Sequence, residues 1–127
     1  MKAPSVSDYR ELARRRLPRF LFEYIDVGSY EEVTVGKNLA DLREVELRQR
    51  VLRDVSKLDL STRLFGREWS TSAVLLGRPW AYALAGAGQA GVAHILQLIR
   101  SEMRVAMALT SCSRLSDISR GVLVWRQ

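Results

Sequence analysis

Three glycines in the second half of the chain have the spacing of a loop that binds a dinucleotide. Gly86, Gly88 and Gly91 fit the pattern G-x-G-x-x-G, in which glycine lets the backbone approach a pyrophosphate. That chemistry needs a strand directly before the glycines and an acidic residue about 20 positions after them. Here an alanine-rich stretch beginning at Pro79 precedes them, and the following acidic residues lie at other distances. We therefore expect these glycines to form a bend between two helices.

Metal and nucleic-acid chemistry have little support in the composition. Cys112 and His94 are the single cysteine and the single histidine, so the chain holds no intrachain disulfide and no metal site built from these residue types. The formal net charge is +6, but apart from Arg14 to Arg16 the basic residues of the first half alternate with acidic ones. That pattern is typical of a mixed solvated surface rather than of a surface that follows phosphates.

The elements that must position any site are mostly helical. With 127 residues and 47% hydrophobic residues, the chain is expected to form one soluble, mostly helical α+β domain. In the second expected helix, Phe20, Leu21, Tyr24 and Ile25 share the apolar face. Periodicity predicts helices over residues 7–16, 18–28, 31–42 and 92–109, a short helix over 116–119, an extended segment over 45–52 and a buried strand over 73–76.

Two long stretches resemble a known family. The stretch from SDYRELARRRLPRFLFEYIDVG to VLRDVS is similar to the N-terminal segment of FMN-dependent L-2-hydroxy-acid dehydrogenases and oxidases, most closely the bacterial L-lactate dehydrogenase branch. The stretch AVLLGRPWAYALAGAGQAGVAHILQLIRSEMRVAMALTSCSRLSDIS is similar to the C-terminal end of the same family. Together these resemblances cover nearly the whole chain.

The resemblance implies a remnant of a larger fold. Members of this family are TIM (β/α)8 barrels, and such a barrel needs around 250 residues. Residues 1–71 correspond to the family's N-terminal helical segment, and residues 72–127 correspond to its last barrel strand and C-terminal helices. We therefore expect a single fragment, internally deleted near residues 71–72, that lacks most of the barrel strands.

The family's chemistry is the FMN-dependent oxidation of L-lactate or a similar L-2-hydroxy acid to the 2-oxo acid. A histidine in a motif of the type S-N-H-G-G-R-Q takes the substrate's proton in the relatives, and this sequence has no counterpart of that motif. The flavin-contacting lysine is also missing, and His94 lies in the family's C-terminal helix, where we expect a structural role. No catalytic residue is assigned, and the chain alone is expected to be inactive.

Three family positions remain in the sequence. The resemblance implies that Tyr24 contacts the substrate carboxylate and that Gly77 and Arg78 hold the FMN phosphate. Each also has an ordinary structural explanation. Without a barrel, Tyr24 is expected to be a core aromatic, and Arg78 is a candidate for a solvent-facing residue at a helix start.

The partners follow from the same resemblance. The alternative to a catalytic role is a non-catalytic interaction fragment that packs on full-length subunits, or that forms a homo-oligomer. Surfaces that face the missing barrel would be exposed, which predicts poor solubility. Nucleic-acid binding is not expected. The resemblance implies a location in the cytoplasm or at the cytoplasmic face of the bacterial inner membrane. The family resemblance is the only reason to expect an association with the membrane.

Overall fold

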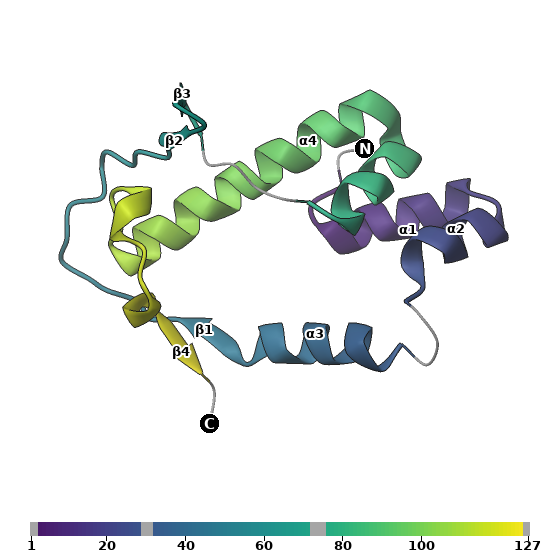
Figure 1. Cartoon of the computed structure of the whole chain (residues 1–127), viewed down its shortest axis with the longest axis horizontal. Coiled ribbons are helices and arrows are strands. Elements are labelled where there is room, and N and C mark those ends of the chain that lie inside the picture. The colour runs from purple at the N-terminus through teal and green to yellow at the C-terminus, as the bar shows by residue number, and fades with distance from the viewer. Residues whose placement is uncertain (1–2, 29–31, 72–75, 126–127) are drawn as a thin grey trace. The chain divides into compact units, whose positions relative to one another are not determined.

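The computed structural model describes residues 3–28, 32–71 and 76–125, and the chain divides into two units (Figure 1). The first unit combines residues 1–32 with residues 74–99, and the second combines residues 33–73 with residues 100–127. Each unit therefore contains residues from both of the stretches that carry the family resemblance.

The first unit is built from helices α1 (Val6–Arg16) and α2 (Arg19–Asp26) and the first part of α4 (Arg78–Thr110). Helix α1 begins after Ser5, whose hydroxyl accepts a hydrogen bond from the Asp8 amide at 3.2 Å and so caps the helix. It ends at Leu17, since a residue before proline avoids the helical conformation. The core of this unit contains Ala3, Tyr9, Ala13, Phe22, Tyr82, Ala83 and Ile95.

Helix α4 bends at the glycines, which confirms the prediction of two helices joined there. Gly88 has φ 62° and ψ −149°, a conformation that is essentially restricted to glycine. A Cβ atom at Gly91 would collide with the carbonyl oxygen of Ala83, and one at Gly86 would lie 3.0 Å from the Leu12 Cβ. The three glycines thus allow a bend and two close backbone contacts.

The second unit holds α3 (Val33–Arg43), two small antiparallel sheets and the last part of α4. Strand β1 (Val45–Leu47) pairs with β4 (Leu123–Trp125), so that Leu47 lies opposite Leu123. Strands β2 (Thr62–Leu64) and β3 (Arg67–Trp69) form a hairpin. Its two loop residues, Phe65 and Gly66, both have positive φ, as a type I′ turn requires. The core of this unit contains Leu60, Met107, Cys112 and Val122.

Several sequence predictions for this unit need correction. The extended segment expected over residues 45–52 is a strand only at Val45–Leu47, and its partner is β4, which the sequence patterns did not predict. The hairpin lies in a stretch for which the sequence analysis predicted neither a helix nor a strand. The short helix expected over residues 116–119 is a 3-10 turn at Leu115–Asp117. The strand expected over residues 73–76 lies almost wholly outside the described residues.

The described residues form a mostly helical structure with small antiparallel sheets, and they contain no closed barrel. This confirms the coarse fold class expected from the sequence. A search of the described helices for one long and apolar enough to cross a membrane found none, including within the uncharged stretch around the glycine bend.

The bend gives a first prediction about stability. Gly91→Ala should lower the free energy of unfolding by about 1–3 kcal/mol, because the added methyl group must displace the Ala83 carbonyl or the helix that carries it. Gly36→Ala is the matched control, since a Cβ atom there meets nothing within 4 Å and α3 should gain about 1 kcal/mol. Urea unfolding followed by circular dichroism measures both, and equal effects of the two variants would contradict the packing described here.

Candidate functional site

Tyr24 lies on the surface of the first unit. Its exposed fraction is 84%, so the prediction that it is a core aromatic is wrong. Phe20 and Leu21, which were expected on the same buried face, are exposed as well. The α2 side chain that enters the core is Phe22, which is 8% exposed, and Ile25 packs partly against it.

The rotation of α2 follows from its last residue. In the α2 sequence RFLFEYID the charged residues lie on one side of the helix and the apolar residues on the other. Periodicity alone therefore favours burial of Leu21 and Ile25 over Phe22, which borders the charged side. Asp26 lies one helical turn after Phe22 and therefore on the same face. Its carboxylate binds residues of α1 and α4, and these contacts turn Phe22 inward and leave Tyr24 in solvent.

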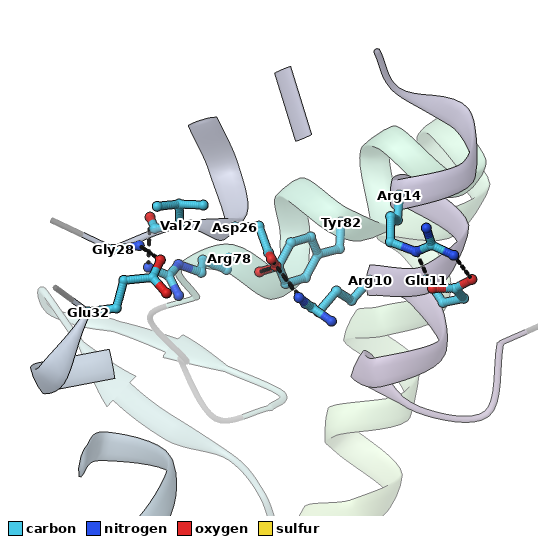
Figure 2. Close-up of polar contacts among 9 residues, drawn as sticks. All are labelled: Arg10, Glu11, Arg14, Asp26, Val27, Gly28, Glu32, Arg78 and Tyr82. Atoms are coloured by element: carbon cyan, nitrogen blue, oxygen red, sulfur yellow. Dashed lines mark hydrogen bonds and ion pairs between the residues drawn. The ribbon is translucent and has the colours of Figure 1, made fainter. Parts of the chain in front are cut away.

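The Asp26 carboxylate joins three helices (Figure 2). Arg10 of α1 donates from Nε to Oδ1 and from Nη2 to Oδ2, both at 2.6 Å, and the Tyr82 hydroxyl of α4 donates to Oδ1 at 2.8 Å. The Arg10 guanidinium also lies over the Phe22 ring, 5.6 Å from its centroid. The Asp26 side chain is only 13% exposed, so this ion pair is less screened than the surface pairs of α1.

The cluster shifts the protonation of its members. Hydrogen bonding to Arg10 holds the pKa of Asp26 below its ordinary value, with a smaller contribution from the Tyr82 hydroxyl. Burial and then the bond to Asp26 raise the pKa of Tyr82. Because the pKa of Asp26 is lower in the folded chain, its contacts stabilise the fold above the unfolded pKa of about 3.9 and are lost as the pH falls through the folded value.

Arg78 opens α4 beside the end of α2. One of its Nη2 protons is donated to the Val27 carbonyl oxygen at 3.3 Å. The amide of the same peptide unit, at Gly28, donates to Glu32 Oε1 at 2.8 Å. Figure 2 shows Val27, Gly28, Glu32 and Arg78 together at this junction. Tyr24 is three residues before Val27, so the side chain implied for the substrate and the one implied for the phosphate belong to the same unit.

The start of α4 has the donor chemistry that a phosphate group needs. Gly77 is exposed, and a Cβ atom placed on it would have nothing within 4 Å, so a ligand can approach its backbone. The first backbone amides of a helix have no intrahelical partner, and its dipole favours a negative charge there. Pro79 has no N–H, so the amides of Arg78 and Trp80 are the backbone donors in the first three positions of α4. The half-buried Arg78 guanidinium adds charged donors next to them. Gly77 and Arg78 therefore fit the phosphate end of a flavin nucleotide.

The single histidine is engaged elsewhere in the same unit. His94 Nδ1 and the Tyr9 hydroxyl share a hydrogen bond of 2.8 Å, and their ring centroids lie 5.9 Å apart. Tyr9 is buried in the core, so the bond holds the half-buried imidazole against α1. Cys112 is buried in the core of the second unit. Among the described residues there is no cluster of side chains suited to a metal ion.

A hollow of about 550 Å³ lies beside Asp26, but its charges are already balanced. Its arginines are paired, Arg14 with Glu11 and Arg19 with Glu23. The two arginines that bind Glu11 lower the pKa of that carboxyl to about 2, yet these side chains lie in water and the pairs add little stability. The hollow is lined by Arg14, Leu17, Arg19, Phe22, Glu23 and Asp26.

Sequence reasoning proposed Tyr24, Gly77 and Arg78 as site residues and did not predict the Asp26 cluster in the same unit. Asp26 and Tyr82 are 56 positions apart, and no local pattern marks either one. The one available signal was the position of Asp26, which lies one helical turn after the apolar Phe22. An acid on the buried side of a helix needs a partner, and Arg10 and Tyr82 provide it.

Comparison with known proteins defines the class of protein. The sequence matches the FMN-dependent dehydrogenase family over residues 13–72 and again over residues 71–125. These two segments include almost all of the chain and meet at residues 71–72. The chain therefore belongs to the FMN-dependent dehydrogenase family.

Within this family, the chain is similar to bacterial L-lactate dehydrogenases. It is 50% identical over 91 residues to the L-lactate dehydrogenase of Haemophilus influenzae (strain PittEE), which covers 70% of this chain and 24% of that protein. It is 51% identical over 92 residues to that of Caulobacter vibrioides (strain NA1000 / CB15N), covering 71% and 24%. The matched region thus spans only about a quarter of the length of these relatives.

Proposed function

We propose that this chain carries part of the ligand site of a flavin-dependent L-lactate dehydrogenase and does not oxidise the hydroxy acid by itself. In this proposal Tyr24 contacts the carboxylate of L-lactate or a similar L-2-hydroxy acid, and Gly77 and Arg78 hold the phosphate of FMN. The observation that supports it is the junction of α2 and α4, where the Asp26–Tyr82 and Val27–Arg78 bonds keep the two regions in one unit.

The residues present are suited to binding and not to proton transfer. Arg78 offers guanidinium donors to a phosphate, and the exposed Tyr24 offers a hydroxyl to a carboxylate. FMN, when bound, would supply the group that accepts the substrate's electrons. A base within hydrogen-bonding distance of the substrate is also required, and His94 is held by the buried Tyr9. Without a positioned base, the geometry for proton abstraction is missing.

The family match supports the proposal that the chain is an internally deleted member. The two matched segments meet at residues 71–72, while the relatives are about four times longer than the matched region. In the relatives these segments would then be separated by the strands that complete the barrel. Loss of those strands removes the motif that carries the base and leaves the phosphate contact.

A comparison of two flavins tests the phosphate contact. Purified chain should bind FMN weakly and bind riboflavin, which lacks the phosphate, more weakly still. Arg78→Met should weaken FMN binding by at least about tenfold, as expected for the loss of a charge-assisted hydrogen bond. Flavin fluorescence titration measures the affinities, and Arg104→Met, an exposed arginine of the second unit, is the matched control.

The same preparations test the proposed lack of turnover. L-lactate should not reduce a dye in the presence of the chain and excess FMN. Reduction of the dye at a rate above that of free FMN would refute the inactive assignment. Equal binding of FMN and riboflavin, or an unchanged affinity in Arg78→Met, would refute the phosphate role of Arg78.

A second candidate function, a fragment that packs on full-length subunits, is supported by the exposed surface of α2. Phe20, Tyr24 and Val27 follow one another at helical spacing and are all exposed. Large apolar side chains grouped in this way are typical of an interaction surface. In the barrel relatives, the helix face that carries the substrate-binding tyrosine would point toward the barrel. A barrel subunit is therefore the expected partner.

Co-elution with a full-length relative tests this second function. In size-exclusion chromatography, the chain should elute together with the Caulobacter vibrioides L-lactate dehydrogenase, and Phe20→Glu should abolish that co-elution. Phe65→Glu is the control, because Phe65 is equally apolar and exposed but belongs to the hairpin of the second unit. Separate elution of the unmodified chain would exclude this function.

A further inference from the structure

We infer that Arg10 keeps Arg78 available for an anionic ligand by occupying the Asp26 carboxylate, which would otherwise capture the Arg78 guanidinium. The inference rests on the proposed function in one respect, namely that Arg78 is the phosphate ligand. It assigns to Arg10 and Asp26 a positioning role that neither the family match nor the sequence pattern suggests.

The first step is the saturation of Asp26. Arg10 and Tyr82 together donate three hydrogen bonds of 2.6–2.8 Å to its two oxygens. Arg10 binds in the two-point manner that matches a guanidinium to a carboxylate. The side chain is 13% exposed, so little of the carboxylate remains for another cation or for water.

The second step is the closeness of Arg78 to the same carboxylate. Tyr82 lies one helical turn after Arg78, and the Val27 carbonyl that accepts from Arg78 directly follows Asp26. The pKa of Asp26 is lowered chiefly by the Arg10 hydrogen bonds and least by the charge of Arg78. Arg78 is thus near enough to act on Asp26 through its charge, but it is not bonded to it.

A second carboxylate at the junction is also engaged. Glu32 accepts the Gly28 amide proton at 2.8 Å, and the structure places no ion pair between Glu32 and Arg78 (Figure 2). Within the described part of the chain, the single hydrogen bond of Arg78 is the 3.3 Å contact with a neutral carbonyl oxygen. A guanidinium has five N–H donors, and the described residues engage one of those of Arg78.

Loss of Arg10 should change this balance. Asp26 would keep one neutral donor, Tyr82, in a largely buried position, and an unpaired buried carboxylate is unfavourable. Arg14 and Arg19 also line the hollow beside Asp26, but they are paired with Glu11 and Glu23. Arg78 is therefore the cation left to pair with Asp26. Formation of that ion pair would turn the guanidinium away from a phosphate at the start of α4.

Nuclear magnetic resonance of the arginine side chains tests the inference on the whole chain. The Nε–H signal of Arg78, assigned with Arg78→Lys, should shift in ligand-free Arg10→Leu and should exchange more slowly with water. Affinity for inorganic phosphate, read from the same signal, should fall about fivefold, near the upper end for one partly exposed ion pair. The double variant Arg10→Leu/Asp26→Asn should restore both the signal and the affinity, which loss of structure would not do.

Two further variants make the result decisive. Arg14→Leu removes an arginine from α1 that pairs with Glu11, and it should leave the Arg78 signal unchanged. If Arg10→Leu unfolds, Arg10→Lys retains the charge but not the two-point contact, and a partial shift of the same signal is expected. An unchanged Arg78 signal in folded Arg10 variants would overturn the inference. If the Arg78 signal of the unmodified chain does not change when phosphate is added, the proposed phosphate role of Arg78 is refuted. The spectra recorded without phosphate still test the inference in that case.

Discussion

The structure of the first unit depends on one largely buried carboxylate. Asp26 receives hydrogen bonds from α1 and from α4, and it belongs to α2, so three helices meet at a single side chain. A buried charge is stable only when it is paired and hydrogen-bonded. The requirement to satisfy Asp26 therefore restricts how these three helices can be arranged.

Two consequences follow for the site. Because Asp26 faces inward with Phe22, Tyr24 is turned to solvent, and because Tyr82 reaches Asp26, the start of α4 is held at the end of α2. The bend at Gly88 then brings the second part of α4 into the same unit, where Ile95 joins the core and His94 meets Tyr9. The start of α4 and an exposed tyrosine are thus kept in one unit although the described residues form no barrel.

The sequence predicted the parts of this structure that local patterns determine. Helix α1, the end of α4 and the bend at the glycines were all predicted correctly, because periodicity and glycine conformation act over a few residues. The buried face of α2 and the pairing of β1 with β4 were not predicted, since partners about 56 and 78 positions away decide them. The resemblance led to the prediction of roles for Tyr24, Gly77 and Arg78, but it gave no information about the Asp26 carboxylate of the same unit.

Native-state hydrogen exchange of the Asp26→Asn variant tests this account most directly. If Asp26 joins the three helices, the amides of α1, of α2 and of α4 up to Ile99 should all lose protection by a similar factor, while those of the second unit keep theirs. Glu11→Gln, which removes only exposed ion pairs, should leave the pattern unchanged. Loss of protection confined to α2, or spread evenly over both units, would contradict the central role assigned to Asp26.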